Sequence, residues 1–435
     1  MTSYLQRYDE ASDEDKFRLV RKWIDHEPLP FFKELREKRP VLETSHGTLF
    51  AHHDDVIDIL SQPKNFTVEL YVPKQSDGRY LMSHDDDALH TREKSLMQGV
   101  LNRDDLPFVR EVVRQLCTEI LDNAKNNRIE AAYDYCRSVP AGLVQSYFGF
   151  TGIEREKLIE WSYWAQYDTF HNQPFDLRSD VEAKRIHDNN LRAADELAKY
   201  ITELIAHRIF VAKLIAPWQW IKGLWRRVFG KPKEITDDIV ARMLRTNLPA
   251  EIDFDIERVG VNISGLLIGA VETTARAVAL VTQYLMQHPE WYAQAKEAAQ
   301  AKNPARFDGI VWEALRFVAP FPYTFRVCGN DCLVGAGTER ATTVKRGTKV
   351  LALTQSAVFD PRAFDNPDEF KPDRDFYRYF HFGFGSHECL GKYVGMVMIP
   401  EMVRQLWLRP NLKAEAPIDF KGGPFAEKYE LSWGQ

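Results

Sequence analysis

Cys389 stands in a sequence context that can hold a reactive thiolate. It follows a glycine-rich stretch, Phe382-Gly383-Phe384-Gly385, and precedes an apolar segment with helical periodicity. Glycine permits backbone angles closed to other residues, and the N–H groups at a helix start can stabilise a negatively charged sulfur. A thiolate held in this way can ligate haem iron and favour cleavage of an O–O bond. The alternative is a buried, inert thiol beside a glycine turn.

The run from Phe382 to Gly391 resembles the haem-binding loop of the cytochrome P450 superfamily, with phenylalanine seven residues before the cysteine and glycine two after it. The resemblance implies haem b (iron protoporphyrin IX) as cofactor, with Cys389 as the iron ligand and Phe382 and Gly391 as further residues of the cofactor site. It also implies a mainly α-helical fold with a small β-rich portion. In that fold the haem is buried between a long central helix and the helix after the cysteine loop.

Residues 259–286 form a long apolar segment that predicts a buried helix with a polar interruption. Glu272 and Arg276 would be costly in lipid, which favours a core helix over a membrane span. The segment resembles the family's oxygen-activating helix. By that resemblance, Thr273 hydrogen-bonds the iron-bound oxygen species and Glu272 helps to deliver protons from solvent. Alternatively, Thr273 bonds back to a helix carbonyl and Glu272 pairs with a basic neighbour.

A charge network is expected to support the cysteine loop. Glu313 and Arg316 are three residues apart, so they share one helix face and can pair there. Arg374 falls fifteen residues before Cys389, much as in the family. The resemblance implies that these three charges form a buried network. Because buried pairs are costly to break, the expected role is architectural.

Haem propionates require cations or hydrogen-bond donors, and the resemblance nominates four residues for them: His90, Lys94, Arg326 and His387. Lys94 stands where arginine is usual, and lysine offers a point charge instead of a planar fork. For His90 the alternative is a solvated histidine beside the acidic residues 85–87.

The substrate pocket would by analogy use residues 66–82, the apolar helix face around Leu267 and Val271, and the turn from Phe321 to Thr324. These side chains indicate apolar and aromatic walls, so we expect an apolar small-molecule substrate of undefined identity. Core packing is an equally available role for each of them.

The composition fits one globular unit. The chain has 435 residues, of which 44% are hydrophobic and 12% aromatic, and its motifs extend from His90 to Cys389. We therefore expect a single cytochrome P450 domain over residues 1–435. The net charge of −6 argues against nucleic-acid binding, which needs a basic stripe. A start without a signal or anchor segment, together with five cysteines, predicts a cytoplasmic protein.

The expected secondary structure begins with a hairpin, residues 41–43 and 48–51, followed by a short helix over residues 54–60. Helical periodicity dominates residues 104–287, and residues 333–350 return to short strands. One helix is expected to end near Ile209 and the next to begin near Thr236. We expect the stretch between them, approximately residues 210–233, to be an insertion.

Residues 217–230 within this insertion are rich in tryptophan and basic residues. On a helix, the apolar residues align on one face with positive charges nearby: Trp218, Ile221, Trp225 and Phe229 beside Lys222, Arg226 and Arg227. Such a segment can lie on an anionic membrane surface or contact a partner protein. The favoured alternative is a helix docked on its own protein, since stripes at helical spacing usually mean packing.

The resemblance implies a monooxygenase that inserts one atom of dioxygen into its substrate. Only 46 residues follow Cys389, so we expect no flavin or nicotinamide domain there. The electrons would then come from a separate ferredoxin or flavodoxin with its reductase. Two rival hypotheses remain: a peroxide-driven or hydroperoxide-rearranging enzyme, and a haem sensor without turnover. The Glu272-Thr273 pair favours the monooxygenase.

Overall fold

The computed structural model describes most of the chain. The described residues are 3–75, 80–85, 87–229, 237–246 and 254–434, with side chains described throughout except at residues 214–229.

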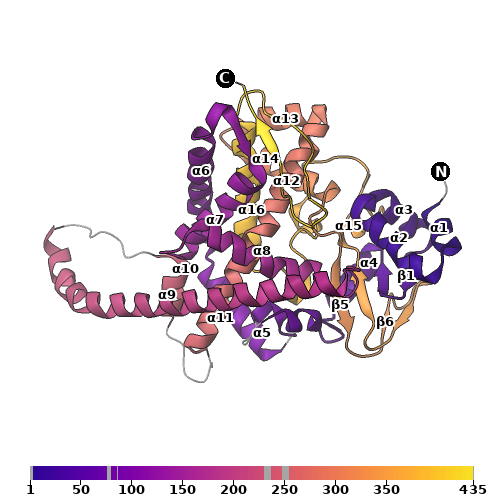
Figure 1. The fold of residues 1–435 in the computed structure, drawn as a ribbon, viewed down its shortest axis with the longest axis horizontal. Helices are drawn as coiled ribbons and strands as arrows, with labels where there is room; N and C mark the ends of the chain where they lie inside the picture. Colours follow the sequence, from indigo (N-terminus) through magenta and orange to yellow (C-terminus); the bar gives the residue numbers. More distant parts are fainter. Residues whose placement is uncertain (1–2, 76–79, 86, 230–236, 247–253, 435) are drawn as a thin grey trace.

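Helices make up most of the molecule, as the sequence predicts (Figure 1). They are α1 (Tyr4–Glu10), α2 (Asp13–His26), α3 (Pro28–Lys38), α4 (His53–Leu60), α5 (Ala88–Val100), α6 (Leu106–Asp122), α7 (Ser138–Leu143), α8 (Arg155–His171), α9 (Asp180–Phe229), α10 (Ile239–Arg245), α11 (Ile256–Ala270), α12 (Glu272–Gln287), α13 (Pro289–Ala299), α14 (Ala305–Phe317), α15 (Thr354–Ala357) and α16 (Lys392–Trp407).

The strands form three small sheets, and the largest has the order β1-β2-β8-β5-β3. In this sheet β2 and β8 are parallel and the other neighbours are antiparallel. The strands are β1 (Val41–Thr44), β2 (Gly47–Phe50), β3 (Phe66–Thr67), β4 (Arg128–Glu130), β5 (Thr324–Cys328), β6 (Cys332–Val334), β7 (Thr342–Val344), β8 (Lys349–Ala352), β9 (Lys413–Ala414) and β10 (Glu430–Ser432).

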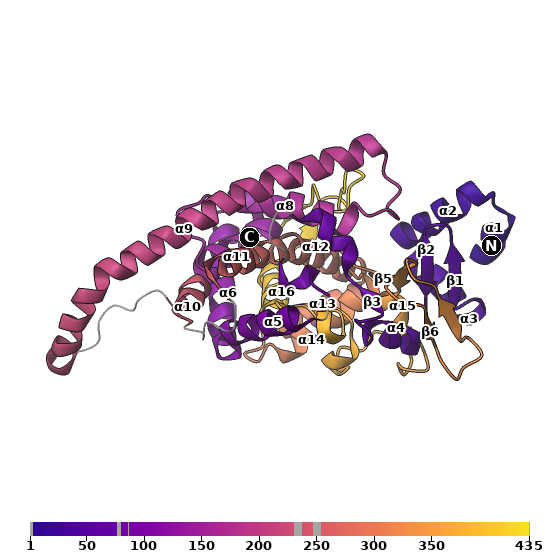
Figure 2. The same ribbon diagram turned by 90° about the horizontal axis from the view of Figure 1, so that it is seen from below.

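The predicted hairpin and short helix near the N-terminus are present as β1, β2 and α4. Gly47 begins β2 with φ +154°, and a Cβ there would lie 2.7 Å from the Lys349 carbonyl oxygen on the neighbouring strand β8. This hairpin, α1, α2 and α3 occupy one end of the molecule, and the helical bulk occupies the other (Figures 1 and 2).

The central apolar segment is interrupted at Val271, which separates α11 from α12 with φ −91° and ψ −69°. Two side chains bond to helix carbonyls beside the interruption. Thr273 Oγ1 donates to the Gly269 carbonyl at 2.9 Å, and Gln166 Nε2 donates to the Ile268 carbonyl. By length and composition residues 256–287 resemble a membrane span, yet 61% of their most apolar 18-residue stretch is buried inside the protein, as expected of a core helix.

Helix α9 differs from the prediction, because it does not end near Ile209 but continues to Phe229. The sequence between residues 206 and 216 contains no glycine or proline that would end a helix. The C-terminal part of α9 projects beyond the helical bulk in both views (Figures 1 and 2). Residues 230–233 of the expected insertion lie outside the described residues, and the contact role of residues 217–230 stays a prediction.

A buried charge network ties α14 to the chain that leads into the cysteine loop. Glu313 and Arg316 are fully buried, with Arg316 Nη2 2.6 Å from Glu313 Oε1. Arg374 Nε lies 3.3 Å from the same carboxylate, and the Tyr379 hydroxyl donates to it at 2.7 Å. The three charges nominated from sequence therefore meet, and Glu313 is their shared acceptor.

Glu313→Gln should destabilise the protein by roughly 3–5 kcal/mol, because it leaves two guanidinium groups buried without a counter-charge. Chemical denaturation, with haem absorbance and circular dichroism as parallel signals, measures this change. Glu297→Gln removes the same charge at an exposed position of α13, and its free energy of unfolding should stay within about 0.5 kcal/mol of wild type. Equal stability of the two variants would contradict the architectural role of Glu313.

Candidate active site

The loop that carries Cys389 depends on two glycines in the left-handed backbone region. Gly383 has φ +74° and Gly385 has φ +75°. A Cβ on Gly385 would also clash with the carbonyl oxygen of Leu60. The loop closes where the Cys389 N–H donates to the Phe382 carbonyl at 2.8 Å, just before α16 begins. The glycines are therefore required by geometry, as the sequence suggested.

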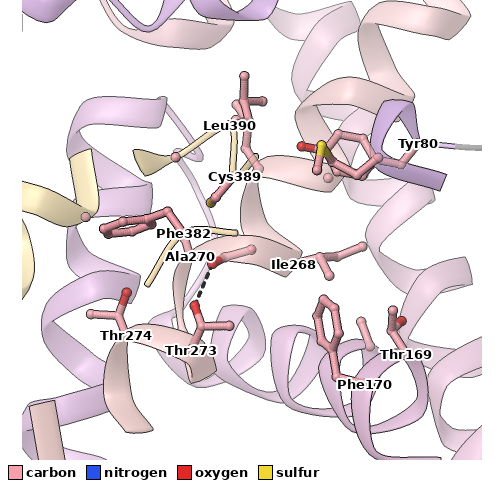
Figure 3. Close-up of a pocket in the computed structure, with 18 of the residues that line it drawn as sticks. Tyr80, Thr169, Phe170, Ile268, Ala270, Thr273, Thr274, Phe382, Cys389 and Leu390 are labelled. Atoms are coloured by element: carbon pink, nitrogen blue, oxygen red, sulfur yellow. Dashed lines mark hydrogen bonds between the residues drawn. The ribbon is translucent and has the colours of Figure 1, made fainter. Parts of the chain in front are cut away.

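The Cys389 side chain opens into a large internal cavity (Figure 3). Burial raises the pKa of this thiol, while the Gly391 backbone N–H and the Lys94 ammonium oppose that rise. A metal ion bound to the sulfur would deprotonate it outright. Phe382 packs beside the loop against Gly395, where a Cβ would lie 2.8 Å from the phenyl ring.

The cavity has a volume of about 950 Å³ and mostly apolar walls. Its walls come from α8, α9, α11, α12, the turn before β5 and the cysteine loop; wall residues include Phe170, Leu197, Leu266, Ile268, Phe321, Thr324, Phe382 and Leu390. Among the expected pocket residues, Phe321 and Thr324 lie in the wall.

Leu267 and Val271, in contrast, do not line the cavity. Both are fully buried in the core behind it. The face of the central helix that meets the cavity instead carries Leu266, Ile268 and Gly269, followed by Ala270 and Thr273. Leu267 and Val271 are four residues apart and so share one face, which points away from the cavity, and the expectation for these two positions was wrong.

Thr273 and Glu272 have different surroundings although they are adjacent. Thr273 lines the cavity, and its hydroxyl donates to the Gly269 carbonyl (dashed in Figure 3). Glu272 is buried and accepts two hydrogen bonds from Arg137 Nε, at 2.8 and 2.9 Å. Burial raises the pKa of Glu272 to about 7, and Arg137 holds it from rising further.

A second, smaller hollow of about 220 Å³ lies on the other side of this ion pair. Arg137 and Glu427 both line it, and Arg137 Nη2 is 3.4 Å from Glu427 Oε1. The Glu427 side chain keeps 25% of its accessible surface, whereas that of Glu272 keeps 1%. Arg137 therefore connects the buried carboxylate of Glu272 to the carboxylate of Glu427, which water can reach.

The cavity edge near β5 offers groups suited to haem propionates. Arg326 is buried in the cavity wall, where burial lowers its pKa. Among the described residues no carboxylate lies within ion-pair distance of Arg326; its Nη1 donates to the Phe325 carbonyl at 2.8 Å. His387 also lines the cavity, and its buried Nδ1 has no hydrogen-bond partner among the described residues. A buried cation and an unsatisfied ring nitrogen fit two negatively charged propionates.

His90 and Lys94 lie one layer back from the cavity wall. The His90 ring packs against His387 with centroids 4.5 Å apart and the ring planes tilted by 31°. Lys94 Nζ donates to the main-chain carbonyls of Ser386 and, at 2.6 Å, Glu388. Lys94 thus binds the backbone of the cysteine loop, a contact that the expected propionate role did not include. A contact of either side chain with haem stays a prediction.

A polar cluster that no sequence pattern predicted lies at the part of the cavity wall that contains Lys74 and Asn190. Asp168 on α8 is fully buried and bonds to Lys74 at 3.0 Å, His187 at 2.8 Å and Asn190 at 2.9 Å. Lys74 and Asn190 line the cavity and come from separate segments. These donors hold the pKa of Asp168 low against the effect of burial.

The comparisons with known proteins identify the family of this chain. Residues 49–409 match the family model described as Cytochrome P450. A steroid C26-monooxygenase of Mycolicibacterium smegmatis is 23% identical over 91% of this chain and 89% of its own length. Cytochrome P450 109 of Bacillus spizizenii is 24% identical over 84% of this chain and 80% of its own.

Solved structures show the same fold. Cytochrome P450 CYP109Q5 from Chondromyces apiculatus aligns with a TM-score of 0.72 at 18% identity, covering 94% of this chain and 95% of its own. CYP109B1 from Bacillus subtilis aligns with a TM-score of 0.71 at 19% identity, covering 94% and 99%. Since the family match spans most of the chain and includes the cavity and its cysteine, the chain belongs to the cytochrome P450 family of haem-thiolate monooxygenases.

Proposed function

We propose that this protein uses dioxygen to hydroxylate or epoxidise an apolar small molecule. The observation that supports this most is the shared cavity of Cys389 and Thr273, with Glu272 buried directly behind the threonine. Haem bound through the cysteine would supply the chemistry of dioxygen reduction and oxygen transfer. The residues of the chain would bind the substrate, exclude bulk water and supply protons.

Proton supply is the task of Glu272 and Thr273 in this proposal. A carboxyl group with a pKa of about 7 exchanges protons readily at neutral pH. Arg137 and Glu427 connect it to the outer hollow, so the proton can be replaced from solvent. The Thr273 hydroxyl, which donates to the Gly269 carbonyl, is a protic group of the cavity wall next to Glu272 in the chain.

The electrons are proposed to come from a separate ferredoxin or flavodoxin with its reductase. An acidic carrier would dock on the cysteine side of the molecule, where positive charge assists association. Lys392, the first residue of α16 on this side, pairs with Glu388 at 2.6 Å, so it contributes little net positive charge. Arg103, whose guanidinium lies 3.8 Å above the Tyr393 ring, adds a further cation to this side.

Turnover under ¹⁸O₂ tests the proposed reaction. The purified protein is supplied with a plant-type [2Fe–2S] ferredoxin, its reductase and an apolar compound that shifts the Soret band. One ¹⁸O atom in the product, with none from labelled water, is expected. A product formed only with added hydroperoxide would favour the peroxide-driven enzyme, and ligand binding without any product would favour a sensor.

Glu272→Gln and Thr273→Ala should uncouple dioxygen consumption from product formation, because proton delivery is impaired in both. We expect product per reducing equivalent to fall at least about tenfold, and the Glu272→Gln rate to fall about a hundredfold. The peroxide-supported rate should stay within about twofold. Thr282→Val is the control, since the hydroxyl of this buried threonine of α12 has no hydrogen-bond partner within the part of the chain that the structure describes. Full coupling in both variants would contradict the proton route.

The rate of the dioxygen-dependent reaction should fall as pH rises through about 7. Burial raises the pKa of Glu272 above its ordinary value, so the proton-donating form predominates below pH 7 and is lost above it. Rates measured with ¹⁸O₂ between pH 6 and 9 should show this decline in wild type. Glu272→Gln has no titrating group at this position, so its rate should be low and independent of pH over this range. If the rate of that variant declined with pH as in wild type, the decline would belong to another group.

A further inference from the structure

Arg276 lies on α12, about one helical turn beyond Thr273. Its Nη1 contacts the ring nitrogen Nε2 of His171 at 3.4 Å. Its Nε is buried without a hydrogen-bond partner, and among the described residues no carboxylate lies within ion-pair distance. The carboxylate of Asp25, which acts on it from farther away, is engaged by Arg21 at 2.9 Å.

The charge on Arg276 persists at neutral pH. Burial lowers its pKa to about 10, which still leaves the guanidinium protonated. Its contact His171 is neutral, because burial and the nearby arginines hold the pKa of that imidazole well below its usual range. A buried cation that meets a neutral ring and no anion is costly. The buried arginines Arg137 and Arg316 each meet a carboxylate, whereas within the described residues Arg276 shares the lack of one with Arg326, which lies in the cavity wall.

This guanidinium stands directly behind the cavity wall. It lies 5.9 Å from the centre of the Phe321 ring, which lines the cavity. Thr273 and Ala277, on either side of it along α12, line the cavity too. Phe321 packs on Phe170 with ring centres 5.5 Å apart, and Phe170 lies on the same side of the cavity as Thr273, away from Cys389 (Figure 3). Arg276 itself does not line the cavity, but it is only half-buried and retains part of its accessible surface beside the wall residue Phe321.

We propose that Arg276 binds the carboxylate of the substrate, so that the natural substrate is an apolar molecule with one acidic group. The planar guanidinium fork matches a carboxylate in two parallel hydrogen bonds, and its unsatisfied N–H groups are available for them. The aromatic side chains beside it, Phe170 and Phe321, suit the apolar body next to that group. This assignment rests on the proposed function, which places the oxidised end of the molecule toward Cys389.

Pairs of acids and their methyl esters test the proposal. Straight-chain acids of six to sixteen carbons and the fused-ring dehydroabietic acid are titrated into the haem-loaded protein, each beside its ester. Calorimetry and the Soret shift both report the dissociation constant. At least one acid should bind about tenfold or more tightly than its ester, and Arg276→Gln should abolish that preference while leaving ester affinity within about threefold. Arg276→Lys, which keeps the charge but loses the planar guanidinium fork, should retain only part of the preference for the acid over its ester.

Arg178→Gln is the matched control, since it removes a nearby positive charge that is already paired with Glu182 at 3.0 Å. It should keep the acid preference. No acid favoured over its ester across the whole panel, or a preference equal in wild type and Arg276→Gln, would overturn the proposal. Calorimetric binding does not depend on oxygen chemistry, so a failed ¹⁸O experiment would leave this result interpretable. A normal reduced-state haem spectrum in each variant shows that it is folded.

Discussion

The backbone that carries Cys389 must hold a sulfur at the edge of an apolar cavity without the support of a regular strand or helix. Two glycines with positive φ set the turn, and the Cys389 amide closes it onto Phe382. Lys94 from α5 then binds the loop carbonyls, and the Glu313 network fixes the chain segment that leads into it. Each contact comes from a different part of the sequence. Residues from distant parts of the sequence therefore position the Cys389 sulfur.

The buried charged groups around the cavity differ in how completely they are paired, and the pairing of each fits its role. The Glu313 pairing is complete, with the carboxylate saturated by donors, and such a site is structural. Glu272 is paired with one arginine only and keeps a pKa near neutrality, which suits a group that exchanges protons. Arg326 and Arg276 lack carboxylate partners among the described residues; Arg326 lines the cavity, and Arg276 lies behind its wall. For Arg326 we expect a haem propionate to supply the missing anion, and for Arg276 we assign that anion to the substrate.

Local sequence patterns predicted the parts of the site that local chemistry determines. The glycines, Cys389 and the hairpin are specified by neighbours in the chain, and the fold class followed from the family resemblance they carry. Leu267 and Val271 were wrongly assigned because this segment is apolar on several faces, so the sequence alone did not show which face meets the cavity. Arg137 reaches Glu272 across 135 residues of sequence, and Asp168 meets Lys74 across 94. No periodicity in a single sequence encodes such contacts.

The most direct test of the account is the absorption spectrum of the dithionite-reduced protein with carbon monoxide. Wild type and Cys332→Ser, a variant of another partly accessible cysteine, should show the strongly red-shifted Soret band of thiolate-ligated haem. Cys389→Ser should lose that band while the apoprotein keeps its helical circular dichroism. A red-shifted band that survives in Cys389→Ser, or a wild-type band characteristic of histidine-ligated haem, would contradict the assignment of Cys389 as the iron ligand.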